Sequence, residues 1–283
     1  MKVMVTGATG FIGRHVVASL CDRHHQVVAT GRDREKARRL PWYDQVEFAA
    51  FDLSTDPSHL TQQHADADVL IHLAWGGLPS YKELVHLEAN LPQSYQLVKS
   101  AVAAGIPQVL VVGTCFEYGQ LQGCLSEDTP TNPCTAYGIA KDSLRRSLEM
   151  LKNQQPFVLQ WARIFYLFGD GQNPKSLLAQ LDAALDRGDS HFPMSGGEQL
   201  RDYLPVNEVA RRLVVLAEHR QSSGIYNICR GQPISVRQLV EDHCVQRGKT
   251  IPLQRGVYPY PDYEPFAFWG DSRKFLSLEA SPS

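Results

Sequence analysis

The chain has 283 residues, 43% of them hydrophobic, which is enough to bury one large core or a core with a smaller second lobe. Its formal net charge is −2 and acidic and basic residues are interspersed, which argues against a nucleic-acid surface or a polybasic membrane patch. The six cysteines are scattered, with no C-x-x-C pair and no histidine at metal-ligand spacing, so we expect free thiols and no metal site.

The start of the chain and its apolar runs bear on location. Met1 and Lys2 lead at once into a core strand, which leaves no room for a signal peptide. No later apolar run reaches the length needed to span a bilayer. We therefore expect a cytoplasmic protein with no membrane partner.

A glycine-rich turn follows the first predicted strand, residues 2–6. Gly7, Gly10 and Gly13 stand in a G-x-x-G-x-x-G spacing, and helical periodicity follows over 11–23. Such glycines allow a tight turn, close approach of a phosphate and close helix packing, while the helix N-terminus attracts an anion. A purely structural turn is the alternative. The residues expected to contact a dinucleotide here are Gly7, Thr9, Gly10, Phe11, Ile12 and Gly13.

Apolar, β-branched runs then alternate with helical patterns, which is typical of a parallel sheet. The predicted strands that follow are 26–30, 46–51, 69–73, 108–112 and 157–163. The predicted helices that follow are 33–40, 81–104 and 137–152. After residue 163 the connections are rich in Gly, Pro and Asp, which indicates a less regular second lobe. We expect one domain over 1–163 and a lobe over 164–283, with part of 201–235 returning to the first domain.

A second constellation is Tyr137 and Lys141, four residues apart on a predicted helix. At that spacing both side chains share one face, so the ammonium is expected to lower the pKa of the phenol, which is about 10 in isolation. Thr114 follows the strand over 108–112, and ligands bind beyond the carboxyl ends of parallel strands. Thr114 is a candidate to orient the oxygen that Tyr137 protonates; a hydroxyl that satisfies a turn is the alternative.

The ordered set of motifs resembles the extended short-chain dehydrogenase/reductases, and within them the nucleotide-sugar epimerase/dehydratase branch. The set is T-G-x-x-G-F-I-G from Thr6, Asp52-Leu53, His72-Leu73-Ala74, then Thr114, Tyr137 and Lys141, and R-D-Y-L-P-V from Arg201. The resemblance implies a Rossmann fold, a doubly wound parallel α/β sheet, with a smaller C-terminal lobe that binds a nucleoside-diphosphate sugar. It also implies bound NAD or NADP and a catalytic Thr-Tyr-Lys trio.

The resemblance assigns further residues. Asp52 would contact the adenine, and Arg201 would offer a cation to the sugar diphosphate, a task that suits a guanidinium. The remaining residues of the implied cofactor cleft are Leu53, Leu73, Ala74 and Trp75.

Three departures from the family pattern narrow the reaction. Gly31-Arg32 replaces the acidic residue that NAD-specific members carry after the second strand, which favours NADP; the neighbouring Asp33, or an Arg32 that is merely exposed, is the alternative. Cys115 and Phe116 stand where sugar dehydratases have an acidic pair, which disfavours dehydration. Tyr166 replaces an asparagine beside the sugar diphosphate.

These observations predict an NAD(P)H-dependent reductase of a nucleoside-diphosphate 4-keto-6-deoxysugar, with dTDP as the expected carrier. The substrate-binding candidates are Thr114, Cys115, Phe116, Tyr166 and Arg201. NADP(H) is the favoured cofactor with NAD(H) open, and a homodimer is expected. A 4-epimerase that retains NAD and a non-catalytic NADP-binding regulator are the alternatives.

Overall fold

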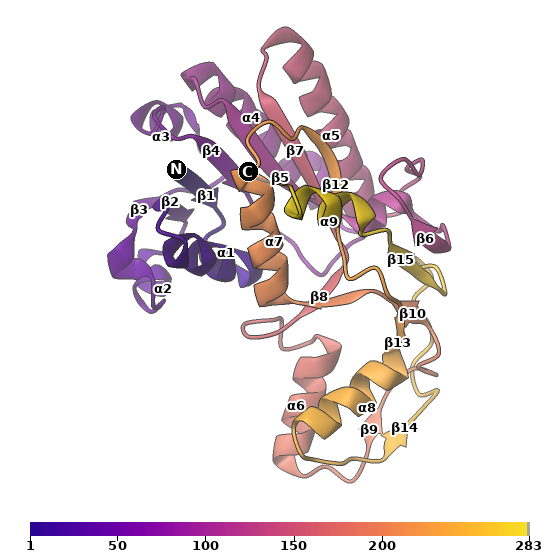
Figure 1. Cartoon of the computed structure of the whole chain (residues 1–283). Helices are drawn as coiled ribbons and strands as arrows, with labels where there is room; N and C mark the ends of the chain where they lie inside the picture. Colours follow the sequence, from indigo (N-terminus) through magenta and orange to yellow (C-terminus); the bar gives the residue numbers. More distant parts are fainter. Residues whose placement is uncertain (282–283) are drawn as a thin grey trace.

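The computed structural model describes residues 1–281 and contains a parallel seven-stranded sheet (Figure 1). The strand order is β12-β7-β5-β4-β1-β2-β3, and every neighbouring pair is parallel. The strands are β1 (Lys2–Thr6), β2 (Gln26–Gly31), β3 (Glu47–Ala50), β4 (Val69–His72), β5 (Gln108–Thr114), β7 (Val158–Ile164) and β12 (Gly224–Ile228). The central strands are buried along their whole length, as expected for a sheet covered on both faces.

Helices cover the sheet on two sides (Figure 1). One face packs on α1 (Phe11–Asp22), α2 (Arg34–Arg38), α7 (Val206–Glu218) and α9 (Arg273–Glu279). The other face packs on α3 (Ser58–Gln63), α4 (Leu91–Ala104) and α5 (Ala136–Gln154). This is the doubly wound arrangement that the alternating pattern predicted.

The strand order reverses direction at β1. From β1 the chain builds outward to β2 and β3 on one side, and to β4, β5, β7 and β12 on the other. In open parallel sheets the ligand crevice lies at this switch point, outside the carboxyl ends of the strands. The loops after β1, β4 and β5 therefore position the site.

A smaller lobe lies beyond the carboxyl ends of the strands (Figure 1). Its core is formed where α6 (Leu177–Arg187) and α8 (Val236–Gln246) pack together with β9 (Phe192–Pro193) and β14 (Leu253–Gln254). Three short ladders connect it to the sheet. They pair β8 (Tyr166–Phe168) with β11 (Tyr203–Pro205), β10 (Leu200–Arg201) with β13 (Ile234–Ser235), and β6 (Gly123–Leu125) with β15 (Phe268–Gly270).

The helix predicted over 81–104 begins later than expected and opens with an irregular turn. Residues 86–90 form a π-helical turn, and α4 begins only at Leu91, with Pro92 in its first turn. A π-helical turn inside a longer helix is uncommon and is often found at functional sites. The other predicted elements of the first domain are confirmed to within a few residues.

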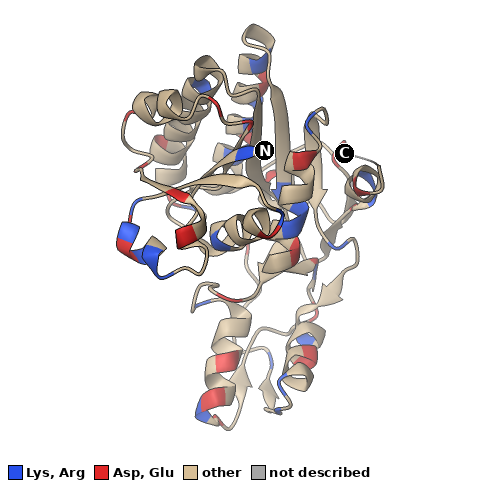
Figure 2. Ribbon diagram, turned by 60° about the vertical axis from the view of Figure 1, so that its left-hand side comes forward, with Lys and Arg blue, Asp and Glu red and all other residues tan. Residues whose placement is uncertain are grey.

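Charge is distributed over both lobes. Figure 2 shows Lys and Arg positions mixed with Asp and Glu positions on the helices and loops. Within residues 1–281, no helix is long and apolar enough to cross a membrane.

Candidate active site

The glycine turn after β1 forms a close-fitting cradle. Gly7 has φ +71°, and a Cβ on it would lie 2.8 Å from the backbone nitrogen of Ala74. A Cβ on Gly13 would collide with the Gly7 carbonyl oxygen, and one on Gly10 would lie 3.1 Å from that oxygen. Helix α1 begins after Gly10 with no side-chain cap and no acidic residue in its first turn, so its N–H groups point at a site for an anion. These residues fit a dinucleotide pyrophosphate.

The end of β2 presents one unengaged cation. Arg32 is exposed and forms no ion pair or side-chain hydrogen bond with other residues of the 1–281 segment. Asp33 instead caps α2 by accepting from the Lys36 backbone N–H at 3.0 Å. A Cβ on Gly31 would lie 3.1 Å from Thr9 Oγ1, so Thr9 limits what can replace this glycine. The arrangement leaves the Arg32 guanidinium available to a ligand, while Oδ1 of Asp33 is engaged at the cap of α2.

The other residues assigned to the cofactor cleft follow the carboxyl ends of β3 and β4. Asp52 follows β3, and its carboxylate accepts from Ser54 N–H at 2.9 Å and from Ser54 Oγ at 2.7 Å, which lowers the pKa of Asp52. Leu53 and Leu73 are half-buried against the two sheet cores. Ala74 passes directly against Gly7.

The predicted trio converges at the carboxyl end of β5. Thr114 is the last residue of β5, while Tyr137 and Lys141 lie in the first two turns of α5; all three are buried. Thr135 caps α5 by accepting from Gly138 N–H at 3.1 Å. Gly138 permits the close approach, because a Cβ there would lie 2.7 Å from the Phe116 carbonyl oxygen.

One electrostatic expectation for this trio differs from the structure. Burial raises the pKa of Tyr137, opposed by a polar contact with the Thr114 side chain, so the prediction that Lys141 lowers this pKa was wrong. The Lys141 ammonium instead donates to the Val112 carbonyl oxygen at 2.8 Å. Burial lowers the pKa of Lys141 to about 7, opposed by the negative charge of Glu117. Tyr137 therefore keeps its proton at neutral pH, as a proton donor must.

Glu117 is a residue that the sequence interpretation missed. Its carboxylate is fully buried and accepts from the Thr114 backbone N–H at 2.8 Å, from Trp161 Nε1 at 3.0 Å and from Arg163 Nε at 2.7 Å. The Arg163 guanidinium also lies 4.6 Å from the Tyr118 ring centroid. The sequence did contain a signal for this residue, because T-x-x-E is the pattern of a capping box. The structure forms that capping box from Thr114 and Glu117. This network fixes the turn that presents Thr114.

The candidate substrate side of the trio is aromatic. Tyr81 packs 4.8 Å from Phe116 and 5.7 Å from Tyr137, measured between ring centroids, and Phe116 lies 6.4 Å from Tyr166. The Tyr166 hydroxyl is buried without a hydrogen-bond partner among the described residues. Burial raises the pKa of Cys115, so this thiol is neutral and cannot replace a carboxylate as base.

Arg201, the cation assigned to the sugar diphosphate, is buried and has internal partners. It is 3% exposed, and its guanidinium donates to Glu264 at 2.8 Å and to the carbonyl oxygens of Leu200 and Phe266 at 2.8 and 3.0 Å. Its partner Glu264 comes from the segment before β15, which the sequence interpretation did not single out. The structure gives Arg201 internal partners in place of an exposed fork of donors.

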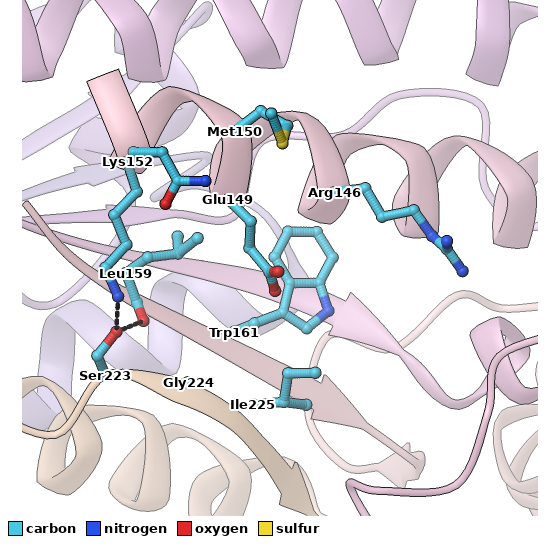
Figure 3. Close-up of a pocket in the computed structure, with 10 residues that line it drawn as sticks. Arg146, Glu149, Met150, Lys152, Leu159, Trp161, Ser223, Gly224 and Ile225 are labelled. Atoms are coloured by element: carbon cyan, nitrogen blue, oxygen red, sulfur yellow. Dashed lines mark hydrogen bonds between the residues drawn. The ribbon is translucent and has the colours of Figure 1, made fainter. Parts of the chain in front are cut away.

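One pocket of the molecule lies away from Thr114, Tyr137 and Lys141. Figure 3 shows it between α5 and the β7 and β12 edge of the sheet, where Ser223 accepts from Lys152 and donates to the Leu159 carbonyl oxygen. Its volume is about 440 Å³, but none of the predicted site residues lines it. Arg146 and Met150, which line it, lie more than two turns along α5 from Tyr137. The converging trio, rather than this pocket, is the candidate active site.

Comparison with known proteins gives the family. Residues 3–229 match the model of the NAD dependent epimerase/dehydratase family. A dTDP-6-deoxy-L-talose 4-dehydrogenase (NAD(+)) of Aggregatibacter actinomycetemcomitans is 32% identical over 275 residues, covering 95% of this chain and 99% of that protein. A dTDP-6-deoxy-L-talose 4-dehydrogenase (NAD(P)(+)) of Kitasatospora kifunensis is 29% identical over 92% of this chain and 83% of its own.

A solved structure agrees with these matches. MoeE5 in complex with UDP-glucuronic acid and NAD superposes with a TM-score of 0.84 at 28% identity, covering 100% of this chain and 94% of that one. The Rossmann fold predicted from the sequence is thereby confirmed. The chain belongs to the NAD-dependent epimerase/dehydratase family.

Proposed function

We propose that the protein is an NAD(P)H-dependent reductase of a nucleoside-diphosphate 4-keto-6-deoxysugar. The observation that carries the proposal is the convergence of Thr114, Tyr137 and Lys141 beside two groups that cannot act as acid or base at neutral pH, Cys115 and Phe116. A site of this kind can protonate an oxygen but has no carboxylate pair for eliminating water.

Each side chain of the trio has one task. The bound nicotinamide dinucleotide supplies the hydride that reaches the keto carbon C4. Tyr137 donates its proton to the oxygen on C4 as negative charge develops there, which turns the ketone into an alcohol. The Thr114 hydroxyl accepts from Phe116 N–H at 3.3 Å, which leaves its own proton to orient the same oxygen. Lys141 would hold the nicotinamide ribose when the dinucleotide is bound.

The end of β2 favours a reductase over a 4-epimerase. A 4-epimerase would use the same trio but must retain its cofactor, typically NAD, through an oxidation and a re-reduction. Gly31 and Arg32, in place of an acidic residue, favour NADP instead.

Arg32 bears on the choice of cofactor, and two relatives bear on the class of substrate. Unengaged Arg32 beside Gly31 favours NADP(H), since a guanidinium matches a 2′-phosphate and Asp33 is engaged at the cap of α2. The two relatives named dTDP-6-deoxy-L-talose 4-dehydrogenase support a dTDP-linked 6-deoxyhexose as substrate. The second lobe would hold the nucleoside diphosphate.

A substrate panel tests the proposal. Purified protein is incubated with NADPH or NADH and with dTDP- and UDP-linked 4-keto-6-deoxysugars, and cofactor oxidation is followed optically. We expect stoichiometric oxidation with the dTDP-4-keto-6-deoxysugar and none with UDP-glucose. Interconversion of UDP-glucose and UDP-galactose without net cofactor consumption would instead identify an epimerase.

A further inference from the structure

The inference concerns Trp75, which lies after β4 in the loop that faces the trio. The Lys141 ammonium is 3.7 Å from the centroid of the Trp75 ring, well within cation–π range. Tyr137 packs edge-on against the same indole, with centroids 6.0 Å apart. Trp75 therefore contacts two of the three candidate catalytic side chains at once.

The indole is itself held by a second residue, His86. Trp75 Nε1 donates to His86 Nδ1 at 3.0 Å, while His86 Nε2 lies 3.1 Å from the Ser80 carbonyl oxygen. A carbonyl oxygen only accepts, so Nε2 carries the imidazole proton and Nδ1 is the acceptor. His86 is fully buried, and burial lowers its pKa, which keeps the ring neutral. His86 thus acts as a fixed acceptor that orients the indole.

The π-helical turn explains how His86 reaches this position. His86 opens the turn and Asn90 closes it, and Asn90 exchanges two hydrogen bonds with the backbone of Gly76, at 3.0 and 3.1 Å. These bonds tie the loop that carries Trp75 to the start of α4. The π-helical turn thereby holds the indole in two ways. His86 accepts from its ring nitrogen, and Asn90 binds the loop that carries it.

Lys141 needs such support because few groups stabilise its charge. Its ammonium is buried and has one hydrogen bond among the described residues, to the Val112 carbonyl oxygen. Glu117 supplies a favourable negative charge but makes no hydrogen bond to Lys141. An aromatic face attracts a cation most strongly where water is excluded.

We propose that Trp75 is a positioning residue for Lys141, whose ammonium its indole face holds beside Tyr137, and that His86 fixes the indole through its ring nitrogen. The inference rests on the proposed role of Lys141 toward the nicotinamide ribose. It assigns Trp75 an effect on cofactor affinity that acts through Lys141 and not by direct contact.

A double-mutant cycle on NADPH affinity tests this, and it needs no sugar substrate. The four proteins are the wild type, Trp75→Leu, Lys141→Met and the double variant, titrated with NADPH by calorimetry. We expect Trp75→Leu to weaken binding on the order of tenfold when Lys141 is present, and to have little effect in the Lys141→Met background. Trp75→Phe, which keeps an aromatic face, should restore most of the affinity.

Controls separate positioning from folding. Trp42→Leu makes the same change at a buried indole whose Nε1 likewise donates one hydrogen bond, here to the backbone oxygen of Arg14 at 3.1 Å, in the core on the opposite sheet face. It should lower the melting temperature without coupling to Lys141→Met. If Trp75→Leu does not fold, Trp75→Met replaces it, since a flexible thioether fills the gap.

Equal losses from Trp75→Leu with and without the Lys141 ammonium would overturn the inference, and so would no loss at all. The first result would mean that the indole contacts the cofactor directly or only supports the fold. The proposed function fails on a different observation, which is intact NADPH binding without reduction of any keto-sugar. The two failures are therefore distinguishable.

Discussion

Glu117→Gln is expected to destabilise the protein strongly, although it only replaces one carboxylate oxygen with an amide nitrogen. The substitution removes the charge that faces the Arg163 guanidinium, 2.7 Å away at 1% exposure. Arg163 Nη1 already lacks a hydrogen-bond partner among the described residues, so only the face of the Tyr118 ring would remain to stabilise the cation. Breaking one side of a buried ion pair costs about 3–5 kcal/mol.

The loss is measurable by heat and by denaturant. With an unfolding entropy of about 2 cal/mol/K per residue, that cost lowers the melting temperature of a chain of this length by about 5–10 °C. Glu35→Gln is the matched control, because Glu35 pairs with Arg38 at the surface, where a pair contributes less than about 1 kcal/mol.

The double variant supplies the decisive comparison. Arg163→Met alone leaves the Glu117 charge buried without its cation and should be as costly as Glu117→Gln. Combining the two removes both charges, so the double variant should lose less stability than the sum of the single variants. Additive losses, or a Glu117→Gln protein that melts at the wild-type temperature, would refute the assignment of this network as the support of Thr114.

Three further predictions address the cofactor. Arg32→Ala should weaken NADPH binding by about 1–3 kcal/mol, or roughly 5- to 150-fold, and leave NADH binding unchanged; equal wild-type affinity for the two would contradict it. Gly10→Val should abolish binding of both dinucleotides, because the added side chain fills the cradle, and a titration that still saturates would exclude the cradle as the phosphate site. Because the Lys141 pKa is lowered to about 7, its ammonium is present below that pH and lost above it, so kcat/KM for NADPH should fall as pH rises through about 7. The Lys141→Met variant should lack this fall of kcat/KM with rising pH.

Local patterns predicted most elements up to residue 163 and the positions of Thr114, Tyr137 and Lys141. The alternation of apolar runs predicted the parallel strands, and the glycine spacing predicted the turn that precedes α1. The i, i+4 spacing placed Tyr137 and Lys141 on one helix face, and strand order placed Thr114 beside them. These inferences depend on residues close in sequence or on a general rule of sheet topology.

The features that could not be predicted depend on residues distant in sequence. The pKa of Tyr137 is raised chiefly by burial and further by Tyr81, Cys115 and Glu117, and its own helix carries none of these three residues. Arg201 is engaged by Glu264, 63 residues further along the chain. The π-helical turn at His86 depends on hydrogen bonds with Trp75 and Ser80, in a loop whose course the local pattern did not predict.

Isotope transfer shows directly whether the hydride of the cofactor reaches C4 of the sugar. The enzyme is given NADPH deuterated at the transferable position together with a dTDP-4-keto-6-deoxysugar, and the product is analysed by NMR. The account predicts one deuterium at C4 for each NADP⁺ formed, at a rate that Tyr137→Phe lowers by about two to four powers of ten. A product without deuterium at C4, or a Tyr137→Phe protein as fast as the wild type, would contradict it.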